Sequence, residues 1–275
     1  GQSGLVFGSS SRGKALRQLV FLLTALAVAY RFSQLRFGLT GETAHASLLS
    51  LLSGKALIPD QYRVLVPWLV NLIMRISNLL PGSSNLSHVM VFQHIELLSV
   101  FLLLASFSYY ASLFFREYVI AVLATVILFS GLLFNYVLPQ PDVLTLEYVS
   151  WFPSDMPSLL FITLGLILIY KHRWWAYYPL YVIATFNRET TCFLTFVYLF
   201  THLGKGRNRE LFFHCALQLS IWITIKYTLY HMYIGNPSDV GGSGLFHAGD
   251  FLNGTNLRTL TNVRNHPFIF SIVGY

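Results

Sequence analysis

The stretch VMVFQHIELLSVFLLLASFSYYASLFF (residues 89–115), followed after Arg116 and Glu117 by YVIAVLATVILFSGLLFNYVL (residues 118–138), decides the fold class. Each run is at least as long as the roughly 20 apolar residues that an α-helix needs to cross the hydrocarbon core of a bilayer. Both runs are therefore predicted to be membrane-spanning helices.

The composition extends this prediction to the whole chain. Of the 275 residues, 55% are hydrophobic and only 11% are charged, whereas a typical soluble domain carries about 25% charged residues. A water-soluble surface cannot be built from so few charges. The sequence therefore predicts one all-α domain over residues 1–275, a polytopic transmembrane helix bundle.

Five further apolar runs accompany residues 89–115 and 118–138. The complete set of predicted spans is 16–32, 89–115, 118–138, 157–170, 174–186, 190–203 and 211–234. The consecutive runs 174–186 and 190–203 are each shorter than a full span and meet at residues 187–189, so they form either two tilted spans that meet at an outer turn or a re-entrant hairpin. Residues 267–275 resemble the start of a further span, and the C-terminal part is expected to be missing.

Basic residues orient the bundle. Arg12, Lys14 and Arg17 precede the first span, which places the N-terminus in the cytoplasm by the positive-inside rule. The basic clusters at 171–173 and 205–209 face the same side only if the ambiguous segment 64–80 lies in the membrane interface instead of crossing it. Residues 34–88 are thus predicted to form a large external loop with interfacial helices at 43–52 and 64–80.

The net charge of +7 follows the same pattern, because the basic residues stand in short runs between apolar segments. Nucleic acid is therefore not an expected partner. Neither cysteine has a metal-ligand spacing and no HExxH occurs, so no cofactor is expected and a divalent metal has no support from the sequence. The pair His94 and Glu96 is interpreted as a polar spot inside the bundle.

Ionisable residues near the outer face of a membrane are candidates for function, since they are costly there unless paired. Glu42, Asp60 and Arg63 lie in the large loop. Asp60 and Arg63 stand three positions apart and can pair on one helical turn. A helix-start motif explains them equally well, with Asp60 as cap and Arg63 extending toward water, and Glu42 also fits an acid near a helix N-terminus.

Two more clusters are predicted on the outer side. Asp142 lies in an aromatic-rich loop, and Asp155 precedes a proline-started helix, where capping alone could explain it. Arg188 and Glu189 interrupt two apolar arms. The planar guanidinium of Arg188 suits a phosphate or carboxylate, while the alternative is a buried ion pair that locks the hairpin.

Three segments carry a resemblance to a known family: PDQYRVLVPWL (59–69), SDMPSLL (154–160) and NRET (187–190). With a large loop after the first span, they resemble the GT-C superfamily of integral-membrane glycosyltransferases. That family usually has an acidic residue, often an acidic pair, at the start of the first external loop. Here Glu42 alone stands near that place, and no Asp-x-Asp is present.

The resemblance implies transfer of a sugar from a polyprenyl-phosphate donor to an acceptor on the non-cytoplasmic face, in a bacterial inner membrane rather than the endoplasmic reticulum. Glu42 would be the catalytic base, with Asp60 second. Arg63 and Arg188 would bind the phosphate, and Glu189 would orient Arg188. Asp142 and Asp155 complete the expected binding set, and an apolar groove would accept the lipid chain.

A second hypothesis comes from another class of protein. The chain could be a non-catalytic membrane subunit whose GT-C-like bundle docks a partner membrane protein or a lipid, an idea favoured by the missing acidic pair. A transporter ranks last, since transporters are typically built from inverted repeats and the sequence shows no repeat.

Overall fold

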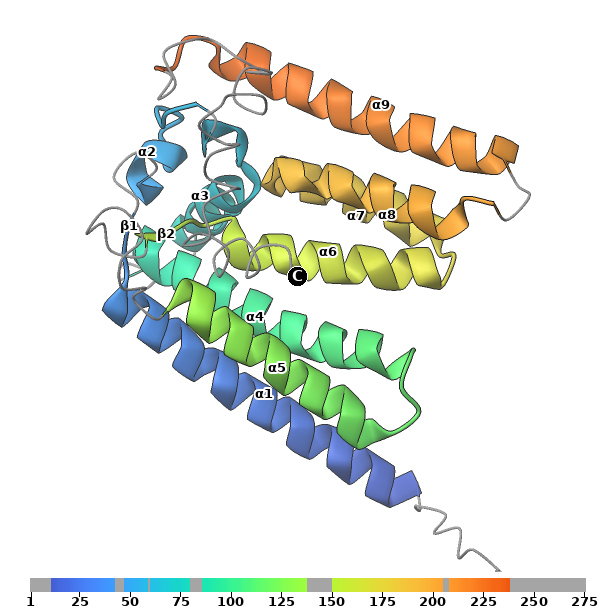
Figure 1. Ribbon diagram of the computed structural model, residues 1–275. Coiled ribbons are helices and arrows are strands. Elements are labelled where there is room, and N and C mark those ends of the chain that lie inside the picture. The colour runs from blue at the N-terminus through green and yellow to red at the C-terminus, as the bar shows by residue number, and fades with distance from the viewer. Residues whose placement is uncertain are drawn as a thin grey trace, which may run out of the picture.

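The computed structural model describes residues 11–42, 47–58, 60–79, 86–137, 150–204 and 208–237. Within these residues the chain is an all-α bundle, as predicted, with a group of short elements gathered at one end (Figure 1). The bundle helices are α1 (Ser11–Leu39), α4 (His88–Ser112), α5 (Tyr118–Tyr136), α6 (Asp155–Tyr170), α7 (Trp174–Asn187), α8 (Phe193–His202) and α9 (Asn208–Tyr233).

The short elements define what we call the cap end. They are strand β1 (Gly41–Glu42), helix α2 (Leu48–Leu52), the 3-10 helix η2 (Asp60–Tyr62), helix α3 (Leu65–Asn78), strand β2 (Ser150–Trp151) and the 3-10 turn η3 (Glu189–Cys192) between α7 and α8. The opposite end, which we call the hairpin end, holds the start of α1 and the α4–α5 and α6–α7 connections (Figure 1). Helix α1 thus ends and α4 begins at the cap end.

Among the described residues, three helices are long and apolar enough to cross a membrane: residues Gly13–Leu39 of α1, together with α4 and α5. The next helix, α6, is equally apolar but has 16 residues, fewer than the roughly 20 of a perpendicular span. The apolar helices support the prediction that the chain is an integral membrane protein.

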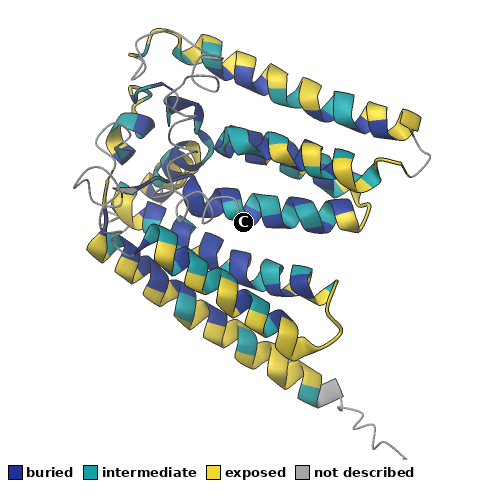
Figure 2. Cartoon of the chain, viewed as in Figure 1, coloured by how far each residue is buried: buried dark blue, intermediate teal, exposed yellow. Residues whose placement is uncertain are grey.

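Two of the hydrophobic clusters among the described residues pack the bundle helices against one another. The first joins α1, α4, α5 and α6 through buried residues such as Phe32, Leu103, Leu132 and Met156. The second joins α6 to α9 and is rich in tyrosine, including Tyr177 and others that the structure buries fully. Figure 2 shows buried residues on the inward faces and exposed residues along the outward faces of α1 and α9.

Several element boundaries differ from the prediction. Residues 34–39, expected in the external loop, continue α1, because Arg36 turns inward and is paired there. The interfacial helix expected at 43–52 begins only at Leu48, where Ser47 Oγ accepts the Ser50 N–H at 3.2 Å. The arm expected at 190–203 starts as η3 and becomes α-helical at Phe193.

Helix α3 is shorter than a membrane span. Its 14 residues give a length of about 21 Å at 1.5 Å per residue, too short to cross the roughly 30 Å hydrocarbon core. Its buried residues Val66 and Val70 pack against α4 and against Leu48 and Trp151 of the cap end. An amphipathic helix of this length suits the membrane interface, and the interfacial position of 64–80 stays a prediction from the basic residues.

Candidate functional site: an ionic network at the cap end

A buried ionic triad connects the cap ends of three helices. Arg36 of α1 donates to Glu96 Oε1 of α4 at 2.9 Å and to Asp155 Oδ2 of α6 at 2.6 Å. All three side chains are at most 6% exposed. Buried charges are stable only when they are paired in this way, so the triad fixes α1, α4 and α6 relative to one another.

Asp155 extends the triad to α7. Its second oxygen, Oδ1, accepts from Arg188 Nη1 at 2.9 Å, and Oδ2 also accepts the backbone N–H of Phe152 at 3.2 Å. The sequence suggested a capping role for Asp155. In the structure it is the first residue of α6, with Ser154 preceding the helix, and both of its oxygens bind arginines.

Asn187 fixes the end of α7 against the start of α6. Its Nδ2 donates to the Ser154 carbonyl at 3.0 Å and to Ser158 Oγ at 2.8 Å. Asn187 is buried, as are both serines. These bonds hold the backbone from which the next two residues, Arg188 and Glu189, project.

A second cluster surrounds Arg63, at the start of α3. Arg63 Nη1 lies 2.9 Å from Asp60 Oδ1, and Nη2 donates to Glu189 Oε1 at 3.0 Å. The pair of Asp60 with Arg63, three positions apart, was predicted from the sequence and is confirmed. Lys226 of α9 brings its Nζ to 3.9 Å from Glu189 Oε2, so one carboxylate joins three separate segments.

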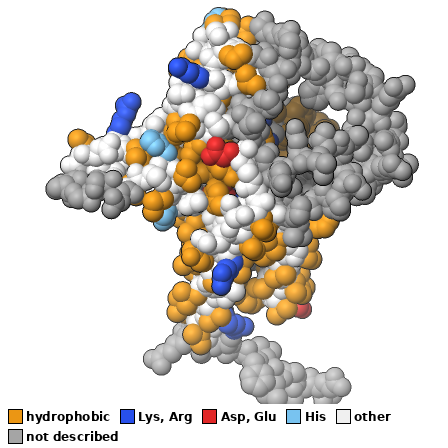
Figure 3. Space-filling model, turned by 90° about the vertical axis from the view of Figure 1, so that its left-hand side faces the viewer, with side chains coloured by type: hydrophobic (Ala, Val, Ile, Leu, Met, Phe, Trp, Pro, Cys, Tyr) orange, Lys and Arg blue, Asp and Glu red, His pale blue; other side chains and the backbone are white. Residues whose placement is uncertain are grey.

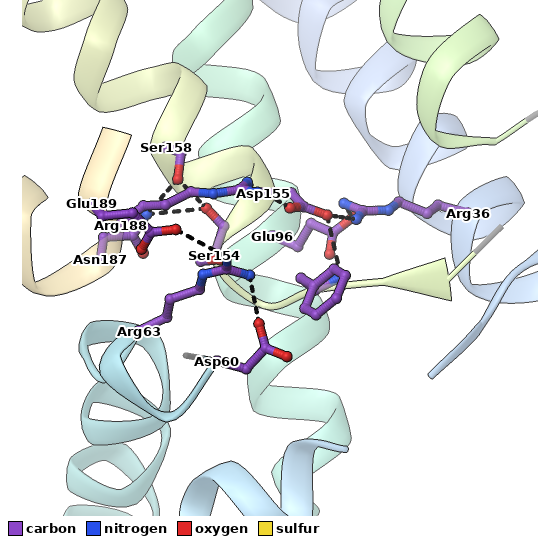
Figure 4. A network of polar contacts seen from close by, with 11 residues as sticks. Arg36, Asp60, Arg63, Glu96, Ser154, Asp155, Ser158, Asn187, Arg188 and Glu189 are labelled. Atoms are coloured by element: carbon purple, nitrogen blue, oxygen red, sulfur yellow. Dashed lines mark hydrogen bonds and ion pairs between the residues drawn. The ribbon is translucent and has the colours of Figure 1, made fainter. Parts of the chain in front are cut away.

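Arg188 and Glu189 are neighbours in sequence but belong to different clusters (Figure 4). The expectation that Glu189 orients Arg188 is wrong. The reason is the extended backbone of Arg188, with φ −158° and ψ 147°, since successive side chains of an extended chain point in opposite directions. Asp155 positions Arg188 instead, and Glu189 positions Arg63.

The charges around Glu189 determine its protonation. Burial alone would raise its pKa, but Arg63 and Lys226 outweigh that effect and lower the pKa from 4.5 to about 2. Burial likewise disfavours the charged form of Arg63, yet Glu189 and Asp60 raise the pKa of its guanidinium. Both groups are therefore ionised at neutral pH, and Glu189 is not a base poised near pH 7.

Glu42 is not part of the network. Glu42 is exposed on β1, which pairs in parallel with β2 so that Glu42 is opposite Trp151. This places Glu42 beside the segment that leads into Asp155, with no ion pair to any residue that the structure describes. Asp142 lies outside the described residues. The structure thus brings together Asp60, Arg63, Asp155, Arg188 and Glu189, and leaves Glu42 exposed outside this network.

Sequence reasoning did not include three charged members of the network among the site residues: Arg36, Glu96 and Lys226. The pair His94 and Glu96 was interpreted as a polar spot inside the bundle. Glu96 is buried, as predicted, and pairs with Arg36, whereas His94 is exposed. The available signal was an ionisable residue inside an apolar run, which calls for a buried partner. The identity of that partner depends on how the helices pack.

Several buried donors of the network have no hydrogen-bond partner among the described residues. They are Lys226 Nζ and the Nε atoms of Arg36, Arg63 and Arg188. Arg188 is also the most exposed of the three arginines, at 26% of its side chain. Viewed from the cap end, the described surface is mainly hydrophobic or uncharged, with a few isolated charged side chains (Figure 3).

The described residues contain no group of three or more His, Cys, Asp or Glu side chains arranged to hold a metal ion. The network consists of arginine and lysine side chains that are held in place by carboxylates. Comparison of the chain with protein-family models, with curated proteins and with solved structures finds no match.

Proposed function

We propose that the protein is a multi-pass membrane glycosyltransferase resembling the GT-C superfamily, which moves a sugar from a polyprenyl-phosphate donor to an acceptor at its cap end. We place that end on the non-cytoplasmic face of a bacterial inner membrane. One observation carries the proposal. The three segments behind the family resemblance contact one another, through Arg63 with Glu189 and Arg188 with Asp155, although Arg63 and Glu189 are 126 positions apart.

The proposed chemistry needs a base for the acceptor and cations for the leaving phosphate. The acceptor oxygen attacks the anomeric carbon, its proton passes to Glu42, and the carbon–oxygen bond to the phosphate breaks with its electron pair on the phosphate. Glu42 suits the base because it is exposed and carries no ion pair among the described residues. Asp60 is less suitable, since Arg63 already holds it at 2.9 Å.

Arg188 and Arg63 would stabilise the charge that develops on the phosphate. A guanidinium binds phosphate oxygens through paired N–H donors, and the side chains of Arg188 and Arg63 are 26% and 12% exposed. Asp155 and Glu189 act as positioning residues, which hold these guanidinium groups before the substrate binds. Membrane lipid surrounds the bundle and supplies the donor.

The test uses purified protein in liposomes with radiolabelled mannose, glucose or arabinose linked to polyprenyl phosphate. Wild-type protein is expected to consume at least one of these donors. Glu42→Gln should lower the rate by about 10²–10⁴-fold, the usual contribution of a general base. Glu117→Gln, an exposed glutamate at the hairpin end, is the matched control. Undiminished turnover by Glu42→Gln, or no turnover of any donor by wild type, would contradict the proposal.

A second candidate is the non-catalytic membrane subunit. The observation in its favour is the charge balance of the network, in which four cations face four carboxylates and lock the helix ends together. A wild-type protein without turnover that forms a stable, stoichiometric complex with another membrane protein would favour this candidate over the enzyme.

A further inference from the structure

A groove on the outside of the bundle runs between α1 and α5, away from the ionic network. Its volume is about 570 Å³, within the usual range of about 300–1,000 Å³ for small-molecule sites. Its walls are apolar and include Leu23, Ala27, Val28 and Leu35 from α1, and Phe129 and Leu133 from α5. Phe32 closes the groove by an edge contact with Phe129 at 6.1 Å between ring centroids.

One charged side chain, that of Arg31, lines this groove. Arg31 is exposed and makes no ion pair or hydrogen bond with any residue that the structure describes. Arg36, five positions further along α1, is 1% exposed and pairs with two carboxylates. At about 100° per residue the two point roughly 140° apart, so one arginine faces the bundle and the other faces outward.

The outward position of Arg31 is costly in a membrane. Arg31 lies within Gly13–Leu39, one of the three segments that can span a bilayer. A charged side chain among lipid chains is unfavourable unless an anion or water reaches it, and among the described residues no carboxylate lines this groove. An anion supplied by the membrane would remove that cost.

The shape of the groove indicates the kind of anion. It follows α1 from Leu23 to Leu35, a rise of roughly 18 Å, which is about the depth of one leaflet of a 30 Å hydrocarbon core. Arg31 lies toward the cap end of this length. A lipid chain would lie along the apolar part, with its headgroup at the arginine, which can extend its guanidinium toward the interface.

We propose that the groove between α1 and α5 is a binding site for one anionic membrane phospholipid of the leaflet at the cap end, with its phosphate on Arg31 and an acyl chain on the apolar wall. The occupant is anionic because the described residues of the groove present one positive charge and no negative one. This site depends on membrane insertion alone and is separate from the proposed sugar transfer.

The test measures lipids retained by the full chain after extraction from membranes, using native mass spectrometry with added phosphatidylglycerol or phosphatidylcholine. Wild-type protein is expected to retain one phosphatidylglycerol in preference to phosphatidylcholine. Arg31→Gln should weaken that retention about fivefold, as expected for loss of one cation at a membrane surface, and should abolish the preference.

Two further variants locate the site. Ala27→Trp keeps Arg31 but fills the groove, at a residue that is exposed and tolerant of size, and should also lose the lipid. Arg75→Gln removes an exposed arginine of α3 outside the groove and should retain it. Equal retention of both lipids by wild type, unchanged retention by Arg31→Gln or Ala27→Trp, or a dimer that covers the groove without lipid would overturn the proposal.

Discussion

Asp155 accepts hydrogen bonds from Arg36, Arg188 and the backbone of Phe152, and this makes it the most connected carboxylate of the network. Asp155→Asn keeps the shape of the side chain but removes its charge. Arg188 then has no carboxylate among the described residues, and Arg36 keeps only Glu96. We expect the free energy of unfolding to fall by about 3–5 kcal/mol, the cost of breaking a buried ion pair, measured by titration with SDS in mixed micelles.

Two variants separate this effect from a general sensitivity to charge. Glu117→Gln, at an exposed site at the hairpin end, should leave the unfolding midpoint unchanged. The double variant Asp155→Asn with Arg188→Gln should lose less than the sum of the two single losses, because residues that share a contact are energetically coupled. An Asp155→Asn protein as stable as wild type would show that the network does not hold the helices together.

The individual ion pairs also differ in how far the sequence could predict them. Asp60 and Arg63 were paired correctly because three positions on one turn bring them together whatever the rest of the chain does. Arg36 and Glu96 are 60 positions apart, and their pairing depends on how α1 packs against α4. The partners of Arg188 and Glu189 were mistaken because the prediction did not include the extended backbone between them.

At the scale of elements, Gly165 sets the distance between α6 and α8. A Cβ atom at this position would lie 2.5 Å from Leu194 Cδ1 and 3.0 Å from Cδ2. Leu194 is itself buried, so it cannot move away freely. Gly165→Ala is therefore expected to destabilise the protein by about 1–3 kcal/mol, the usual cost of overpacking a core, measured in the same SDS titration.

The matched control for Gly165 is Gly38→Ala, because Gly38 also lies in a helix but has nothing within 4 Å of the added Cβ. This variant should lose no stability, since alanine favours a helix over glycine. Gly165→Ala combined with Leu194→Ala should recover part of the overpacking cost. If Gly165→Ala is as stable as Gly38→Ala, the two helices are not in close contact at this point.

Apolar runs predicted where the helices lie much better than where they end. The helices α4 and α5 agree with 89–115 and 118–138 to within a few residues, because apolar residues predominate along each of them. The prediction ended α1 at residue 32 because polar residues follow, yet Arg36 and Ser33 are buried and the helix continues to Leu39. The polar residues after position 32 ended the predicted span. The helix itself continues, because Ser33 and Arg36 are buried and Arg36 is paired.

At the scale of the whole molecule, the basic residues that connect or start the helices gather at one end of the bundle. Arg116, Lys171 and Arg209 all belong to connections or helix starts at the hairpin end (Figure 1), and the ionic network lies at the cap end. This is the separation that the positive-inside rule requires if the hairpin end is cytoplasmic. The sequence predicted the separation because charge placement along the chain needs no knowledge of how the helices pack.

Cysteine labelling tests which side each end faces. The two native cysteines, Cys192 and Cys215, are free and are first replaced by serine and alanine. Single cysteines are then introduced as Gly41→Cys at the cap end and as Glu117→Cys and Lys171→Cys at the hairpin end, all at exposed positions. In spheroplasts a membrane-impermeant maleimide should label Gly41→Cys alone, because the cap end faces outward. In inside-out vesicles it should label Glu117→Cys and Lys171→Cys but not Gly41→Cys. If all three positions react from one side, the long helices do not cross the membrane, and if the pattern is inverted, the network and any sugar transfer belong on the cytoplasmic face.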